Sequence, residues 1–202
     1  EDFSFCSKTP ASRSGLLFVG GGKHLPNPDA IRWFESDILP LIRAERPDIK
    51  FHIVGADLPG DLVRPRDNVI LHGRLTRQQL SDLYDSIQIV VAPLRFGAGI
   101  KGKVFEAIAK GVAVVTTSIG IEGFSETTKH VLESYDTPRA FADRVIELLS
   151  DNGKRESQVE AQFESIKNDF SREELRRVLG CLVRMLVPEK RIEAPEFFEA
   201  RS

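Results

Sequence analysis

The segment IQIVVAPLRFGAGIKGKVFEAIAKGVAVVTT, residues 87–117, contains the pattern that decides the fold. Residues 87–93 form an apolar run ending in proline, which is typical of a strand buried on both faces of a parallel sheet. A glycine-rich turn follows. Residues 103–110 then show helical spacing, and Gly111 suits the end of a helix. Residues 112–116 are a second buried-strand run. The segment therefore predicts a strand, a helix and a second strand in succession.

Similar alternation surrounds this segment. Strands are predicted at 16–19, 51–55 and 69–73, with a sixth, less regular one at 129–132. One helix is predicted at 28–46, with Asn27 as N-cap and Pro28 in the first helical position. Another is predicted from the capping box of Thr76 and Gln79 to residue 86. Alternating strands and helices indicate an α/β fold with a doubly wound parallel sheet, resembling a Rossmann domain.

The two ends of the chain have different patterns. Beyond Pro138 the apolar spacing is helical only, which predicts a helical C-terminal extension. We expect one domain at 15–187, preceded by a linker remnant at 1–14 and followed by a tail at 188–202. The only methionine is Met185, so we expect that further sequence precedes this chain.

Composition excludes several functional classes. Lys and Arg number 28 against 30 Asp and Glu, a balance that gives no reason to expect nucleic acid as a partner. Cys6 and Cys181 have no neighbours at zinc spacing, and the four histidines lack the spacing of a metal site or a nucleophile relay, so no metal is expected. No apolar run approaches the roughly 20 residues that span a bilayer. These features predict a soluble, cytoplasmic protein.

The first candidate site follows residues 16–19. Gly20, Gly21 and Gly22 would let a phosphate approach the backbone, and Lys23 would add charge. Three glycines suit a plain mobile turn equally well. The stretch lacks both the dinucleotide fingerprint and the P-loop, which argues against a dehydrogenase.

The second candidate site is the turn before residues 103–110. Gly97 and Gly99 lead to a helix start, where free backbone N–H groups and the helix dipole favour an anion, and Lys101 and Lys103 add positive charge. Glu106, one turn into the helix, is a candidate for binding ribose hydroxyls. Taken by itself, this residue is better interpreted as an ordinary first-turn acid that stabilises the helix dipole.

Residues 92–117 closely resemble the C-terminal domain of the group 1 glycosyltransferases, the retaining family 4 enzymes with the GT-B fold. The residues in step with the family pattern are Gly97, Gly99, Ile100, Lys101, Lys103, Glu106, Ala107, Ala109 and Gly111. Further matches include Val19-Gly20, Asn27, Trp33-Phe34 and Gly120-Ile121-Glu122-Gly123, so that the resemblance extends over about residues 16–149.

The resemblance implies a donor site for a nucleoside-diphosphate sugar, with no cofactor. It places the donor beside Gly21, Gly22, Lys23, Gly73, Arg74, Leu75, Gly97, Gly99 and Val104, and the catalytic functions on Lys101, Lys103 and Glu106. The two lysines would counter the charge of the leaving group, Glu106 would bind the ribose, and Gly73 to Leu75 would lie beside the base. A hexosyl group would be transferred with retention and without a metal ion.

The chain departs from the family in one position. Many relatives have a glutamate eight residues before the ribose-binding one, and this chain has Ala98 there. The family's N-terminal domain, which would bind a saccharide or lipid-linked acceptor of polysaccharide biosynthesis, is also absent from these residues. We therefore expect the chain to be inactive alone, and peripheral membrane contact stays open for the full-length protein. The alternatives are a non-catalytic nucleotide-sugar-binding module and a GT-B sugar-nucleotide epimerase.

Overall fold

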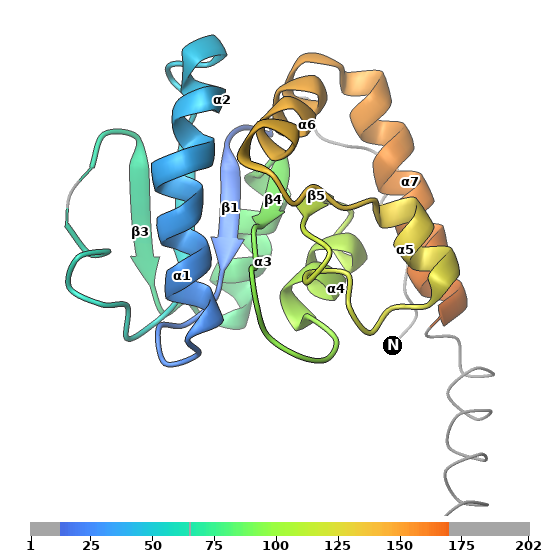
Figure 1. The fold of residues 1–202 in the computed structure, drawn as a ribbon, viewed down its shortest axis with the longest axis horizontal. Helices are drawn as coiled ribbons and strands as arrows, with labels where there is room; N and C mark the ends of the chain where they lie inside the picture. The colour runs from blue at the N-terminus through green and yellow to red at the C-terminus, as the bar shows by residue number, and fades with distance from the viewer. Residues whose placement is uncertain (1–12, 65, 170–202) are drawn as a thin grey trace, which may run out of the picture. The chain divides into compact units, whose positions relative to one another are not determined.

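Five parallel strands form the central sheet of the computed structural model, which describes residues 13–64 and 66–169 (Figure 1). The strands are β1 (Leu16–Val19), β2 (Phe51–Val54), β3 (Val69–Gly73), β4 (Ile89–Ala92) and β5 (Ala113–Thr116), in the order β3-β2-β1-β4-β5. The chain runs from β1 outward to β3, and then returns to build β4 and β5 on the other side. The predicted doubly wound α/β fold is confirmed.

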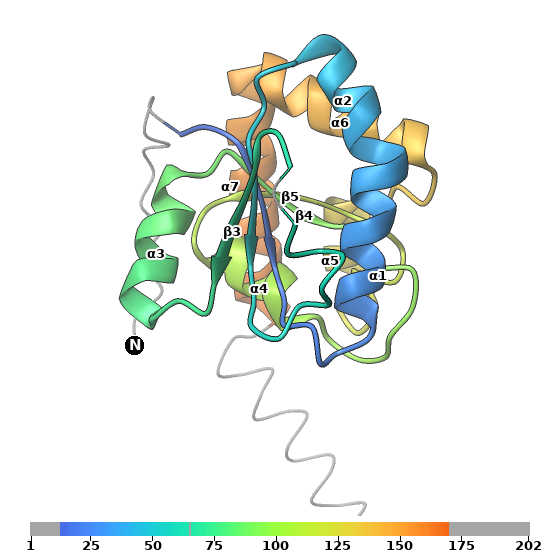
Figure 2. The same ribbon diagram turned by 90° about the vertical axis from the view of Figure 1, so that its left-hand side faces the viewer.

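Helices lie on both faces of this sheet. They are α1 (Pro26–Trp33), the π-helical turn η1 (Phe34–Ile38), α2 (Leu39–Glu45), α3 (Arg77–Ser86), α4 (Gly102–Ala109), α5 (Glu126–Leu132), α6 (Pro138–Ser150) and α7 (Asn152–Asp169). In the view of Figure 2, α1 and α2 lie on one side of the sheet and α3 on the other. None of the helices in the described part of the chain is long and apolar enough to cross a membrane. All but the last two residues of the predicted linker at 1–14 lie outside the described residues. So do the part of the predicted helical extension beyond residue 169, the domain end at 187 and the tail at 188–202.

Three fully buried phenylalanines join the sheet to its helices. The ring centroid of Phe34 in η1 lies 4.6 Å from that of Phe51 in β2 and 6.1 Å from that of Phe141 in α6. Burying each such side chain contributes about 2–3 kcal/mol to folding. These contacts join η1 and α6 to β2 on the α1/α2 face of the sheet.

The predicted helix at 28–46 is present but is interrupted. It begins at Pro26, and Asn27 lies inside its first turn, so the predicted N-cap role of Asn27 is wrong. The Asn27 amide is instead hydrogen-bonded to a neighbouring loop. The interruption at η1 precedes Pro40, which has no N–H to donate back along the helix, and the wider turn accommodates this gap.

The predicted strand at 129–132 is wrong, because these residues belong to α5. The Ser125 hydroxyl accepts from the Thr128 N–H at 3.1 Å and caps the helix, and Thr128 and Leu132 are buried one turn apart. The buried face of this segment is therefore helical, and Lys129 and His130 point away from the core. By contrast, the capping box of Thr76 and Gln79 at the start of α3 is confirmed.

Glutamines of α7 satisfy the outer edge of β5. The fully buried Gln162 amide accepts from the Val114 N–H and donates to the Val114 carbonyl, both at 3.2 Å, and Gln158 donates to the same carbonyl at 2.8 Å. A side-chain amide thus supplies the hydrogen bonds that a sixth strand would make.

We expect Gln162→Met to reduce the free energy of unfolding by about 2 kcal/mol, because the buried Val114 N–H would lose its acceptor. Urea denaturation measures this loss. Gln158→Met is the matched control, since it leaves both Val114 groups bonded to Gln162. An equal loss in the two variants would contradict this assignment.

Two histidines on neighbouring strands contact each other. Nδ1 of His52 in β2 lies 2.9 Å from Nε2 of His72 in β3, and the two rings are stacked with centroids 5.2 Å apart. Burial, followed by the charges of His72 and Lys50, lowers the pKa of His52 to about 4, and burial lowers the pKa of His72. The spacing of the histidines in the sequence gave no sign of this pair.

The pair makes stability depend on pH with a defined sign. Unfolded histidines take up protons below about pH 6.5, whereas His52 stays neutral in the folded protein until about pH 4. Stability should therefore fall as pH falls from about 6.5 to 4. We expect His52→Gln to have a flatter curve over this interval in urea denaturation at stepped pH. Parallel curves for the variant and the unchanged protein would refute the prediction.

Candidate functional site

The candidate site lies where β1 and β4 end side by side. The chain reverses its winding direction between these two strands, and in such sheets the carboxyl ends at that point form a crevice. A cavity of about 290 Å³ is present here. Its lining includes His24, Asn27, Phe96, Ala98, Ile100, Lys101 and Lys103. The residues come from the loop after β1, the first turn of α1, the loop after β4 and the start of α4.

Lys103 is a partly buried cation held by neutral groups. Its Nζ donates a hydrogen bond to Asn27 Oδ1 and lies 4.2 Å from the centre of the Phe18 ring. Within residues 13–64 and 66–169, no carboxylate pairs with it. Burial, with a smaller contribution from the Lys101 charge, lowers the pKa of Lys103 to about 7. The side chain therefore gains or loses its charge near neutral pH.

Lys101 has a different environment from Lys103. Its ammonium donates to the carbonyls of Gly99 at 2.6 Å and Gly97 at 3.3 Å, and lies 3.2 Å from Glu122 Oε2. The side chain is only 8 % exposed. The loop at 97–99 thus wraps around the Lys101 ammonium group, which holds it through these hydrogen bonds. Both glycines have positive φ angles, +125° and +77°, which side chains rarely adopt and which let their carbonyls converge on the lysine.

The three glycines after β1 are held against a second loop. Backbone pairing continues beyond the strands, with Gly22 N donating to the Ala56 carbonyl at 2.8 Å. A Cβ added at Gly22 would lie 2.0 Å from the Asp57 carbonyl oxygen, so the close approach requires glycine. Lys23 is 86 % exposed and lies 3.4 Å from Asp57 Oδ2. The segment is therefore a packed turn that leaves Gly21 beside Asn27.

Other predicted site residues lie on α4 and at the end of β3. Glu106 faces α3, where burial, together with the Glu106 carboxylate, raises the pKa of Tyr84. The Val104 side chain is fully buried, and its N–H donates to the Lys101 carbonyl at 2.9 Å. Gly73 and Arg74 are exposed and Leu75 is half-buried, after the edge strand β3. The structure thus groups Lys101, Lys103, Gly97 and Gly99, and leaves Gly73 to Leu75 two strands from β1.

Asn27 is the site residue that sequence reasoning missed. It was interpreted as a helix cap, but its amide joins the Gly21 carbonyl to Lys103, 76 residues further along the chain. The available signals were its position just after the glycine turn and its match to the family pattern. No group of three or more His, Cys, Asp and Glu side chains that could hold a metal occurs among the described residues.

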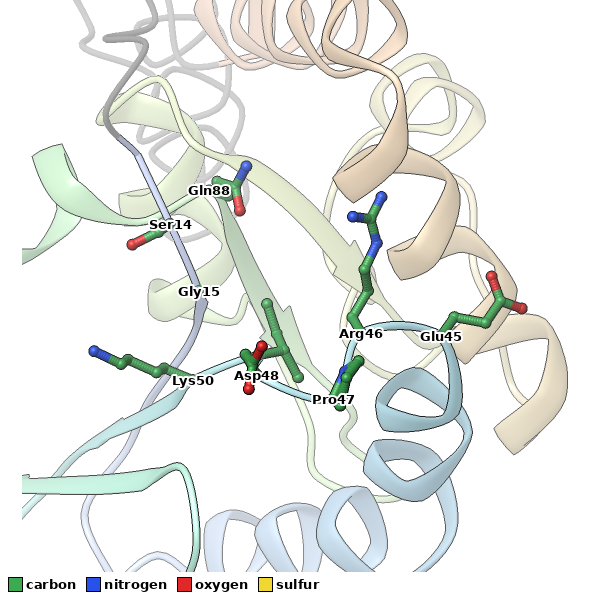
Figure 3. Close-up of a pocket in the computed structure, with 9 residues that line it drawn as sticks. Ser14, Gly15, Glu45, Arg46, Pro47, Asp48, Lys50 and Gln88 are labelled. Carbon is green, nitrogen blue, oxygen red and sulfur yellow. The ribbon is translucent and has the colours of Figure 1, made fainter.

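A second cavity, of about 390 Å³, lies at the opposite end of the strands. Figure 3 shows Ser14, Arg46, Asp48, Lys50 and Gln88 around it. These residues precede or begin β1, β2 and β4, so the cavity is at the amino-terminal edge of the sheet. Ligands of open α/β sheets bind at the other edge, and we assign no function to this cavity.

Comparison with known proteins identifies the class. The sequence profile of the family described as "Glycosyl transferases group 1" matches residues 13–151. The chain belongs to this family. Its sheet is the Rossmann-like half of a GT-B fold, as in the C-terminal domain of LpcC from Francisella tularensis, a group 1 family glycosyl transferase (TM-score 0.58, 16% identity, 80% of this chain and 87% of that one).

Two further relatives are larger than this chain. A point mutant of S. aureus TarM, solved with fondaparinux, alpha-GlcNAc-glycerol and UDP, aligns with a TM-score of 0.63 at 17% identity, over 84% of this chain and 35% of that one. An uncharacterized 44.6 kDa protein in the cps region of Klebsiella pneumoniae is 29% identical over 116 residues, 54% of this chain and 30% of that protein. The chain therefore spans about a third of the length of these relatives.

Proposed function

We propose that this chain is the donor-binding half of a glycosyltransferase, and that the diphosphate of a nucleotide sugar binds between the loop after β1 and the start of α4. The observation that carries the proposal is the position of the Lys103 ammonium group beside the cavity. This group contacts an amide oxygen and the face of an aromatic ring, and it pairs with no carboxylate among the described residues. A cation without a counter-ion at a helix N-terminus favours an anionic ligand.

Lys101 and Lys103 would have different electrostatic functions in the donor site. Lys103 would contact the diphosphate directly and counter the charge that develops on it as the sugar departs. Lys101 is engaged by loop carbonyls and Glu122, so it would shape the Gly97–Gly99 loop and add positive potential. The amides of Gly102 and Lys103 precede the first hydrogen bond of α4, whereas the Val104 amide is already bonded to Lys101. The loop glycines Gly21 and Gly22, with Lys23 at the rim, would border the other side of the diphosphate.

The nucleoside would extend from the start of α4 toward α3 and β3. Glu106 would accept the ribose hydroxyls, and the base would lie beside Gly73, Arg74 and Leu75. The UDP in the structure of the TarM mutant supports uridine diphosphate as the first ligand to test. The gene region named for the Klebsiella relative supports polysaccharide biosynthesis as the process.

Transfer itself would require a second domain that binds a saccharide or lipid-linked acceptor. With that domain in place, we propose that a hexosyl group is transferred with retention and without a metal ion, the lysines taking over the charge stabilisation that a cation would otherwise supply.

One observation favours a second candidate function, a nucleotide-sugar-binding module without transferase activity. Ala98 lines the cavity at the position where many relatives have a glutamate, and no lining residue carries a carboxylate. Transfer of sugar by the full-length protein would exclude this alternative, whereas donor binding without transfer would support it.

The donor site is tested by calorimetric titration of the chain with UDP, GDP, ADP and NAD, first without metal and then with Mg²⁺. We expect metal-independent binding of one nucleoside diphosphate. Lys103→Ala should weaken it about 10- to 100-fold, the value of a charge-assisted hydrogen bond, and Glu106→Ala should also weaken it.

Ala98→Gly is the matched control for this titration, because it changes the same cavity without removing a charge. Its affinity should stay within about twofold of that of the unchanged chain. Equal losses in Lys103→Ala and Ala98→Gly, or binding of NAD alone, would overturn the proposal.

Affinity for UDP should also fall as pH rises from 7 to 9. UDP gains little further charge in this interval, since the last phosphate proton dissociates near pH 6, whereas Lys103 loses its proton above about pH 7. The charged group that bears on it is Lys101, whose repulsion favours this loss. In Lys103→Arg the guanidinium stays protonated, and the dependence should disappear. A fall of the same size in that variant would show that another group titrates.

A further inference from the structure

The two loops that border the candidate site are joined by one side chain. Asn27, in the first turn of α1, is only 5 % exposed. Its Nδ2 donates to the Gly21 carbonyl at 2.8 Å, and its Oδ1 accepts from Lys103 Nζ. Because a carbonyl needs a donor and an ammonium needs an acceptor, only this orientation of the amide satisfies both partners.

Gly20 provides the room for this arrangement. A Cβ added at Gly20 would lie 2.5 Å from Asn27 Cγ and 2.7 Å from both terminal atoms of the amide. Any side chain at position 20 would therefore displace the amide from Lys103. The glycine after β1 has a function in the site that phosphate approach does not explain.

The Lys103 side chain is oriented from two directions. The Phe18 ring lies beneath its ammonium group, and the Asn27 oxygen accepts a hydrogen bond from one of its three N–H groups. Neither contact neutralises the charge. An aspartate at position 27 would instead form an ion pair with Lys103 and neutralise its charge. The neutral amide holds the ammonium group in place and leaves its charge available to an anion.

We propose that Asn27 is a positioning residue of the donor site, which fixes the Lys103 ammonium relative to the loop after β1 so that both can contact one diphosphate. This role rests on the donor-binding function proposed above, because the ammonium held by Asn27 is the one assigned to the diphosphate. Asn27 acts through Lys103 and the Gly21 backbone rather than on the reacting atoms.

The contact is tested first without any ligand, by NMR titration of the lysine side-chain Cε and Hε signals, with the Lys103 signal assigned from its loss in Lys103→Arg. Asn27→Asp should raise the pKa of Lys103 by at least about one unit, because it places an opposite charge beside the ammonium. An unchanged pKa in a folded Asn27→Asp protein would show that residue 27 does not hold Lys103, and would overturn the proposal.

The positioning role is tested next by calorimetry with UDP at pH 7. Asn27→Ala and Gly20→Ala should each weaken binding about tenfold, the first by removing the amide and the second by displacing it. Gln162→Ala is the matched control, because it removes another buried amide that is bonded to backbone groups, at the β5 edge of the sheet and outside the lining of the cavity. It should lower stability and leave the affinity for UDP unchanged.

The outcomes separate the two proposals. Unchanged UDP affinity in a folded Asn27→Ala protein would overturn the positioning role, while leaving the donor site intact. Equal losses of affinity in Asn27→Ala and Gln162→Ala would show an effect of stability alone, and would also overturn it. A chain that binds none of UDP, GDP and ADP, but in which Asn27→Asp still shifts the pKa of Lys103, would refute the donor site and leave Asn27 as a structural tie.

Discussion

The pairing of β1 with β4 is the contact on which the candidate site depends. Leu16 and Leu17 pair with Ile89 and Val90, although more than 70 residues separate them in the chain. This pairing brings the ends of the two strands together, and with them the glycine turn after β1 and the loop before α4. A cation on α4 and a carbonyl after β1 then come within reach of a single amide, that of Asn27.

The two lysines of the site show how similar residues, two positions apart, acquire different properties. Lys101 has loop carbonyls and a carboxylate around its ammonium, so its charge is stabilised by the protein itself. Lys103 has an aromatic face and an amide oxygen, and burial lowers its pKa to about 7. A diphosphate would supply the opposite charge that Lys103 lacks, so binding should be coupled to proton uptake by this lysine.

The parts of the structure that sequence reasoning predicted correctly depend on local signals. Buried-strand runs, the capping box of Thr76 and Gln79 and the glycine stop after α4 each involve residues within a few positions of one another. The run at 129–132 was misread because four apolar and polar residues fit either a strand or a helix face. Contacts between distant residues, such as Asn27 with Lys103 and Gln162 with Val114, leave no pattern in a single sequence.

The β5 edge of the sheet is a second contact that local sequence patterns do not predict, and its energetic cost can be stated. A parallel sheet that ends at β5 exposes backbone groups, and a buried unsatisfied N–H costs about 1–3 kcal/mol. The sequence pattern predicts a sixth strand at 129–132, but these residues are helical. The fold supplies the missing partner from α7, through a glutamine 48 residues away whose amide has both a donor and an acceptor. At the site, the Asn27 amide likewise hydrogen-bonds a backbone group, the Gly21 carbonyl. Its other partner is the charged Lys103 ammonium, so this amide also fixes the position of a charge.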